Sequence, residues 1–212
     1  MIQMSKPLPT AVRNHLTGLR ILLLFTVICG LAYPLLITGV SQVAFHSQAN
    51  GSLVKNASGQ VVGSSLLGQN FTIVSKDGKS QTPDPKFFQS RPSAAGALGY
   101  DPTASGGTNK GTNDAGLVTT YTQLKSDIAK FNGVPESQVP ADAITSSASG
   151  LDPDISPAYA AIQVNRVAKA RGLSVDKVQA LVKQYTQDRT LGFLGEPRVN
   201  VLQLNLALSK LG

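Results

Sequence analysis

The sequence predicts an α+β protein in which one N-terminal transmembrane helix is followed by a mixed, helix-rich extracytoplasmic domain. Two observations carry this prediction: a long uncharged stretch lies near the N-terminus, and short apolar runs downstream give way to segments with helical periodicity. The 212 residues suffice for one anchor and one domain of roughly 150 residues. We therefore divide the chain into a short basic cytoplasmic N-terminus (1–20), a transmembrane helix (21–43) and an outer domain (46–212).

The transmembrane helix is predicted from length and composition. No charged residue occurs between Ile21 and Phe45, and the twenty residues from Ile21 to Val40 match the length that crosses a hydrocarbon layer of about 30 Å. A cleaved signal peptide is disfavoured, because its apolar stretch is usually about 7–15 residues long. A lipoprotein cysteine is disfavoured too, because Cys29 lies in the middle of the stretch. Of the interpretations considered, a true membrane span is therefore the one that the sequence favours.

The flanking charges predict the orientation of this span. Lys6, Arg13 and Arg20 precede it, whereas the first charge after it is Lys55. Positive charge favours the cytoplasmic side of a membrane. The N-terminus is therefore expected in the cytoplasm and the outer domain outside it, in the periplasm of a cell with two membranes.

Small and irregular residues interrupt the span and mark candidate contacts with other transmembrane helices. Pro34 removes a helical N–H group and can kink the helix. Gly30 and Gly39 allow another helix to approach closely. Glycine and proline are also common in membrane spans in general, which is the alternative explanation. We take Gly30, Tyr33, Pro34 and Gly39 as the candidate subunit contacts.

The first part of the outer domain is predicted to hold strands and loops. Short apolar runs at 53–54, 61–62 and 71–74 are separated by turn residues and suit short strands or hairpins. Residues 82–113 are rich in proline and glycine and are predicted to form one long ordered loop or several turns.

Four later segments have apolar residues at helical spacing and capping residues at their ends. They run from Asn113 or Asp114 to Gly133, from Ser156 to Gly172, from Ser174 through Tyr185, and from about Asn200 to Leu211. Around Val199 and Val201 the apolar residues alternate, so a strand is also possible there.

Charge and residue counts exclude several classes of function. The net charge is +7, but lysine and arginine are scattered, so a mixed solvated surface is favoured over nucleic-acid binding. Cys29 is the only cysteine, which excludes an intrachain disulfide and a multi-cysteine zinc site. The only histidines, His15 and His46, flank the span. A histidine-dependent catalytic centre in the outer domain would need His46 to fold back into it.

Three motifs resemble functional sites but are better explained as structural. The glycine-rich segment 105–111 differs from a phosphate-binding loop, because Lys110 precedes its last glycine, and a turn is favoured. Asp152-Pro153-Asp154 is more typical of a turn than of an acid–base pair. Glu196 and Arg198 are expected to form a local ion pair. Twelve scattered acidic residues define no cation site. We predict no catalytic, cofactor-binding or metal-binding residues.

Several stretches, taken together and in order, resemble one known family. They are GLAYPL (30–35), ANGSL (49–53), GSSLLGQ (63–69), FQSRPSA (88–94), SGGTN (105–109), TSSASGLDP (145–153), ISPA (155–158) and RTLGFLGEPRVNV (189–201). They are similar to the C subunit of the bacterial Kdp high-affinity potassium-transporting ATPase. The one mild departure is Thr108, where that family more usually has serine; the hydroxyl is kept.

The resemblance implies a single-span accessory subunit of an ATP-driven potassium uptake pump in the bacterial inner membrane. Its expected partners are a channel-like potassium-binding subunit, a P-type ATP-hydrolysing subunit, a small one-span subunit and membrane lipid, with no nucleic acid. ATP with magnesium, and potassium, would act in the complex rather than on this chain. The family is described as a catalytic chaperone that raises the ATP affinity of the hydrolysing subunit. The alternatives are a membrane-anchored ligand-binding module and a membrane-tethered hydrolase.

Overall fold

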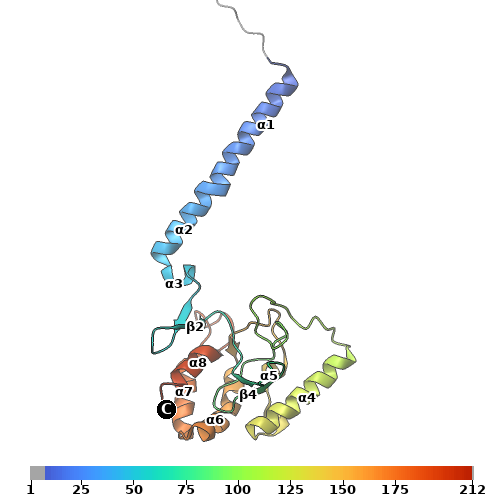
Figure 1. Cartoon of the computed structure of the whole chain (residues 1–212), viewed down its shortest axis with the longest axis vertical. Coiled ribbons are helices and arrows are strands. Elements are labelled where there is room, and N and C mark those ends of the chain that lie inside the picture. The colour runs from blue at the N-terminus through green and yellow to red at the C-terminus, as the bar shows by residue number, and fades with distance from the viewer. Residues whose placement is uncertain (1–7, 212) are drawn as a thin grey trace, which may run out of the picture. The chain divides into compact units, whose positions relative to one another are not determined.

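The computed structural model describes residues 8–211, so the prediction that involved Lys6 lies outside the described residues. The chain divides into two compact units, residues 1–52 and residues 53–212. The first is helical, and the second combines helices with three small antiparallel sheets (Figure 1). This arrangement confirms the predicted α+β class with one apolar N-terminal helix.

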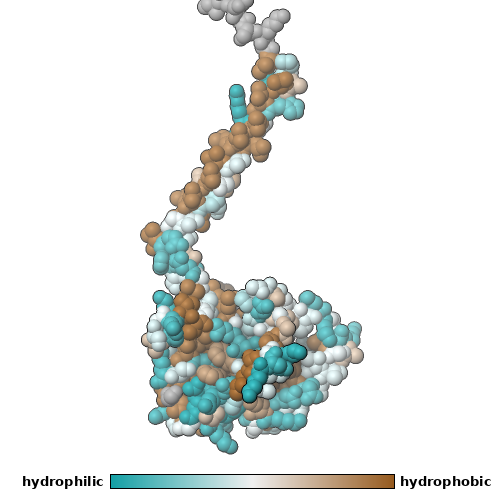
Figure 2. Space-filling model, viewed as in Figure 1, coloured by the Kyte–Doolittle hydropathy of each residue, from teal (hydrophilic) through white to brown (hydrophobic). Residues whose placement is uncertain are grey.

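The first unit is dominated by one long helix, Thr10–Ala44, which has a mean hydropathy of 2.4 and buries none of its residues within the chain. It consists of α1 (Thr10–Val27), the π-turn η1 (Ile28–Ala32) and α2 (Tyr33–Ala44), and the short α3 (His46–Ala49) follows. Figure 2 shows an almost continuous apolar surface along it. Within residues 8–211 it is the one helix long and apolar enough to cross a membrane. Its length of about 52 Å exceeds a hydrocarbon layer of about 30 Å, so its polar first turns can extend beyond the layer.

The helix accommodates Pro34 through the π-turn. The N–H of Tyr33 donates to the carbonyl of Ile28, five residues earlier rather than four. Proline has no N–H to donate, and in a regular helix its ring collides with the carbonyl four residues before it. A wider turn just before Pro34 relieves that collision, and such turns often mark functional sites.

The second unit begins with two hairpins, which confirms the strands predicted between residues 53 and 74. Strand β1 (Leu53–Lys55) pairs with β2 (Val61–Ser64), and β3 (Thr72–Val74) pairs with β4 (Gln81–Pro83). The loop expected from residue 82 therefore begins later, because pairing with β3 draws residues 81–83 into a strand. Residues 84–114 then form turns and bends without a helix or strand.

The rest of the unit is mostly helical, as predicted. Its elements are α4 (Ala115–Asn132), η2 (Glu136–Gln138), α5 (Ala141–Ile144), β5 (Asp154–Ile155), α6 (Pro157–Arg171), α7 (Val175–Tyr185), β6 (Thr186–Gln187), β7 (Arg198–Asn200) and α8 (Val201–Leu208). The last three strands form an antiparallel sheet in the order β5-β7-β6. In Figure 1, α7 and α8 lie on one side of this unit and α4 on the other. The short elements η2 and α5 were not predicted.

The helix ends follow the capping residues in the sequence. The side chains of Asp114, Ser156 and Asn200 accept hydrogen bonds from backbone N–H groups three residues on. Gly133 and Gly172 end α4 and α6 in the left-handed conformation that glycine tolerates best. At the start of α7, Ser174 occupies the cap position without a side-chain bond. At Asn200 strand β7 passes directly into α8, so both structures considered for this region are present.

The core lies where α6, α7 and α8 meet the three-stranded sheet. Val167, Val178, Val199, Leu204 and Leu208 are fully buried there. Burying such a side chain contributes about 1.5–3 kcal/mol. The core therefore holds the C-terminal half together and supports the loops that pack against it.

Buried amide side chains fasten the long loop to this core. The backbone N–H of Phe88 donates to Oδ1 of Asn205, whose Nδ2 donates back to the carbonyl of Phe88, both at 2.9 Å. Gln163 makes the same two-way contact with the backbone of Gln89. These paired bonds satisfy buried backbone groups that no strand partner reaches.

Candidate functional site

The four predicted contact residues of the span all lie on its exposed surface. A Cβ built on Gly39 would meet nothing within 4 Å, and one on Gly30 would meet only Thr26, at 4.0 Å. Tyr33 is 61% exposed and Pro34 follows it at the start of α2. Nine residues separate the two glycines, about half a turn apart at 100° per residue. They therefore offer two different faces to neighbouring helices.

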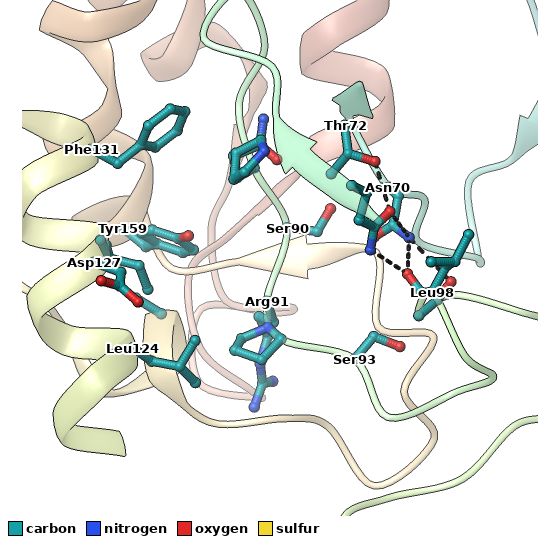
Figure 3. A pocket seen from close by; sticks show the side chains of 17 residues that line it. Asn70, Thr72, Ser90, Arg91, Ser93, Leu98, Leu124, Asp127, Phe131 and Tyr159 are labelled. Atoms are coloured by element: carbon teal, nitrogen blue, oxygen red, sulfur yellow. Dashed lines mark hydrogen bonds between the residues drawn. The ribbon is translucent and has the colours of Figure 1, made fainter. Parts of the chain in front are cut away.

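A cavity of about 550 Å³ lies in the outer domain between α4 and residues 70–99, which contain the β3–β4 hairpin and the first part of the long loop. We call residues 70–99 the loop layer. Figure 3 shows Leu124, Asp127 and Phe131 of α4 along one wall and Asn70 and Leu98 along the other. Its volume falls within the range of small-molecule sites. The cavity is therefore the place to look for ligand chemistry.

The polar groups of this cavity are largely occupied by contacts within the chain. Oγ1 of Thr72 donates to Gln81 at 2.8 Å, and Oγ of Ser93 donates to the carbonyl of Gly150 at 2.6 Å. Arg91 pairs with Asp152, with 2.7 Å between Nη1 and Oδ2. These bonds hold the loop layer in shape. A ligand would thus have to displace them or bind mainly by apolar contact.

The carboxylates near Arg91 are each engaged by a different group. Asp142 accepts hydrogen bonds from the N–H and the hydroxyl of Ser156, at 2.7 and 2.8 Å. Asp152 also accepts the N–H of Asp154, which begins strand β5, so the segment leads into a strand where a turn was predicted. In the part of the chain that the structure describes, no three His, Cys, Asp or Glu side chains form a group that could hold a metal ion.

The expected ion pair between Glu196 and Arg198 is wrong. Glu196 pairs instead with Arg189 at 2.7 Å, and Arg198 pairs with Asp154 at 3.2 Å. The reason is strand pairing: β7 lies between β5 and β6, which places Arg198 beside Asp154 of β5. Residues 188–197 then bring Arg189 back to Glu196 at the base of the loop.

Asp154 gives the outer domain a testable pH dependence. Burial raises the pKa of its carboxyl, and the negative charge of Asp152 raises it further, against the opposing effect of Arg198. Because the folded pKa is raised, the group stabilises the fold below the ordinary aspartate pKa and loses that contribution as pH rises through the raised value. The free energy of unfolding of Asp154→Asn, relative to that of the parent, should therefore be higher at pH 7 than at pH 3.5. Thermal unfolding of both detergent-solubilised chains across this range measures the difference; a constant difference would contradict it.

The glycine-rich segment 105–111 has a structural role. The hydroxyl of Ser105 and the N–H of Gly106 both donate to the carbonyl of Ser149, at 3.0 and 2.9 Å. A Cβ on Gly107 would lie 3.0 Å from the carbonyl oxygen of Ala148, which explains the need for a small residue. Residues 105–111 form neither the predicted turn nor a helix or strand, and the segment packs against residues 148–149.

His46 is occupied within the first unit. Its Nδ1 lies 3.3 Å from Nδ2 of Asn50, four residues along the chain. The carbonyl of His46 also accepts a bond from the Asn50 side chain. The contacts of His46 are thus local to the end of the long helix.

One exposed apolar feature was missed from the sequence. Leu191, Phe193 and Leu194 are 79%, 68% and 50% exposed at the tip of the loop between β6 and β7. The sequence signal is a cluster of three large apolar residues: Leu191 precedes Gly192, and Phe193 and Leu194 lie between Gly192 and Gly195. Apolar residues interrupted by glycine predict neither a core strand nor a helix, so the sequence pattern alone does not mark this exposed group.

An apolar helix long enough to cross a membrane, followed by an α+β domain with its own core, is the arrangement typical of membrane-anchored proteins. Comparison with known proteins makes the assignment specific. The family described as "K+-transporting ATPase, c chain" matches residues 15–210. The chain belongs to this family.

Curated relatives agree with this assignment. A protein of Streptomyces coelicolor is 48% identical over 222 residues, covering 98% of this chain and 97% of the relative. Proteins of Gemmatimonas aurantiaca and Caulobacter vibrioides are 53% and 52% identical, each over 87% of this chain and 86% and 87% of their own lengths. All three are named potassium-transporting ATPase KdpC subunit.

Proposed function

We propose that this chain is the accessory subunit of an ATP-driven potassium uptake pump, assembled with a channel-like subunit, a P-type ATP-hydrolysing subunit and a small one-span subunit. The match to the family over residues 15–210 is the observation that carries the proposal. The apolar helix, which buries none of its residues within the chain, supports it by offering a surface to lipid and partner helices. The outer domain would cap the channel-like subunit near the ion entrance.

The proposed topology follows from the charges around the helix. Residues 1–20 lie in the cytoplasm, residues 21–43 cross the inner membrane and residues 46–212 form a periplasmic domain. Arg13 and Arg20 precede the uncharged stretch, and no charge follows it before Lys55, which favours this orientation.

The chain itself is proposed to be non-catalytic. The outer domain has no histidine and no cysteine after residue 46, so the commonest activated-nucleophile arrangements lack their base. A periplasmic domain also cannot touch a cytoplasmic nucleotide pocket. If the chain raises the ATP affinity of the hydrolysing subunit, the coupling passes through the assembled subunits and the span, as a free energy shared between two distant sites.

The deciding experiment is potassium-stimulated ATPase activity of the solubilised pump with and without this chain, with the recovery of every subunit measured in the same samples. The proposal expects that omission of the chain breaks up the complex or abolishes the coupled activity. Equal assembly and an equal response to potassium and ATP without the chain would exclude an accessory role.

Gly39→Leu is expected to weaken recovery of the partner subunits with this chain. The position is open in the isolated chain, so the substitution should not disturb the helix itself. Forcing a larger side chain into a well-packed contact costs about 1–3 kcal/mol, or roughly a five- to 150-fold weaker association. Gly18→Leu is the matched control, because it is equally open but lies before the predicted span. Equal recovery of both variants would remove Gly39 from the proposed contact.

The cavity beside α4 favours one second function, a membrane-anchored ligand-binding module. Its volume of about 550 Å³ and its mixed lining suit a small molecule. Saturable binding of a small solute by the full chain without partner subunits, measured by calorimetry, would support that function. The pump-subunit proposal expects no such binding.

A further inference from the structure

The loop between β6 and β7 ends in an exposed group of large apolar side chains. We call residues 191–194 the apolar turn. Leu191 is 79% exposed, Phe193 is 68% exposed and Leu194 is 50% exposed. Single exposed apolar residues are common on protein surfaces, but three at one loop tip form a patch.

The apolar turn is held rigidly. Thr190 and Leu194 exchange two backbone hydrogen bonds, each 2.9 Å long. The N–H of Gly192 donates to the carbonyl of Arg189 at 3.0 Å, and the ion pair between Arg189 and Glu196 closes the base of the loop. Strands β6 and β7, which pair side by side, carry the loop. Because its backbone is already fixed by these bonds, the apolar turn would lose little conformational entropy on binding, which favours association.

The backbone of the turn is also strained. Leu191 has a φ of 55°, in the left-handed region that residues with a Cβ rarely adopt. Glycine would remove this strain, and the side chain of Leu191, which is 79% exposed, gains little packing within the domain in return. Local strain without a local benefit points to a use outside the chain.

We propose that the apolar turn inserts into an apolar pocket on an extracytoplasmic surface of another subunit of the pump. This inference rests on the proposed function. A protein pocket fits the charges better than a lipid surface does. Asp188, Arg189, Glu196 and Arg198 flank the turn with a net charge of zero, and both arginines are paired with carboxylates.

Segments that bind anionic membranes carry an excess of lysine and arginine instead. A small apolar centre enclosed by polar, charge-balanced residues is the usual anatomy of a protein–protein contact. Phe193 is the best anchor, since aromatic residues are enriched among those that dominate binding energy.

The test compares three variants of the full-length tagged chain, each co-expressed with the other pump subunits. The first is Leu191→Ser with Phe193→Ser. The second, Leu191→Gly, relieves the strain and removes one apolar side chain. The control is Leu66→Ser with Val118→Ser, which removes two apolar side chains that are 63% and 59% exposed elsewhere in the domain.

The first variant should recover the partner subunits at least tenfold less well than the parent after a wash in 1 M salt, which suppresses charge-based contacts. Leu191→Gly should raise the melting temperature of the chain and still reduce recovery. The control should match the parent. Unchanged recovery with both turn variants, when the parent does recover its partners, would overturn this inference and leave the proposed function standing. Failure of the parent itself to recover partners would instead contradict the proposed function.

A second measurement tests a lipid occupant. The chain contains no tryptophan, so Phe193→Trp introduces a single fluorescent probe. In liposomes that hold this chain without its partners, brominated phospholipid should leave the tryptophan emission unquenched. Strong quenching would show that the apolar turn enters the bilayer, which would overturn the proposal. Loss of a self-associated form of the isolated chain in the Leu191→Ser, Phe193→Ser variant would overturn it in favour of a second copy.

Discussion

Arg166→Met is expected to destabilise the outer domain by about 3 kcal/mol or more, because it removes one buried guanidinium that satisfies several acceptors. Arg166 is only 9% exposed. It donates to the side chain of Asn132 at 2.9 Å, and to the carbonyls of Pro85 and Phe87 at 2.7 and 3.0 Å. Each buried acceptor left without a donor costs about 1–3 kcal/mol. Methionine fills similar space but donates nothing.

The guanidinium also lies 4.4 Å from the ring centroid of Phe131, in the geometry of a cation–π contact. Burial lowers the pKa of Arg166 to about 10, so the side chain is still cationic at neutral pH. The Met substitution thus removes a charged contact between α6 and α4 as well as the hydrogen bonds.

Thermal unfolding of the detergent-solubilised chain, followed by circular dichroism, measures this loss. The matched control is Arg171→Met. Arg171 lies on the same helix, donates to the carbonyl of Lys86 and stacks on Phe87, but is more exposed. The control should lose about 1 kcal/mol or less. Similar losses of stability in the two variants would show that the buried hydrogen bonds of Arg166 contribute no more than the more exposed contacts of Arg171.

Asn205→Leu is expected to cost about 2–5 kcal/mol and to loosen the long loop specifically. Asn205 is 1% exposed and provides both the acceptor and the donor for the backbone of Phe88, whose side chain is fully buried. Leucine has the same branched arrangement of heavy atoms and leaves no cavity, so the loss comes mainly from two unsatisfied buried backbone groups.

Hydrogen exchange at the Phe88 amide gives the most direct readout of this substitution. Exchange there should accelerate far more than in α7, because the two hydrogen bonds that are lost join only Phe88 and Asn205. Asn165→Leu, an exposed position on α6, serves as the control and should change neither stability nor exchange noticeably. Unchanged protection of Phe88 in Asn205→Leu would show that the loop is held by other contacts.

These two side chains explain how a loop as long as residues 84–114 can form a wall of the cavity. Gln163 joins Arg166 to the loop next to Phe88, since its Oε1 accepts from both the Gln89 backbone and Arg166. The loop is therefore fastened to α6 and α8 through side chains instead of through strand pairing. A shift of α6 or α8 would consequently be passed to the cavity.

Local features of the outer domain could be predicted from the sequence. Asp114, Ser156 and Asn200 begin helices and Gly133 and Gly172 end them, and each cap acts on groups within three or four residues. The apolar span was predictable for the same reason, because its length and lack of charge are properties of one continuous stretch. Such features depend on neighbours along the chain, which the sequence states directly.

The tertiary structure alone decided which distant residues meet. The amide pair joins positions 117 residues apart, and Arg166 reaches carbonyls about 80 residues away. Arg198 had an acidic neighbour in sequence, Glu196, yet pairs with Asp154 because strand order brings that carboxylate beside it. The exposure of the apolar turn belongs to the same group, since burial is a property of packing. Hydrophobic periodicity and capping therefore determined the span and the longer helices, whereas the partners of polar side chains and the surface left uncovered followed only from how those elements pack.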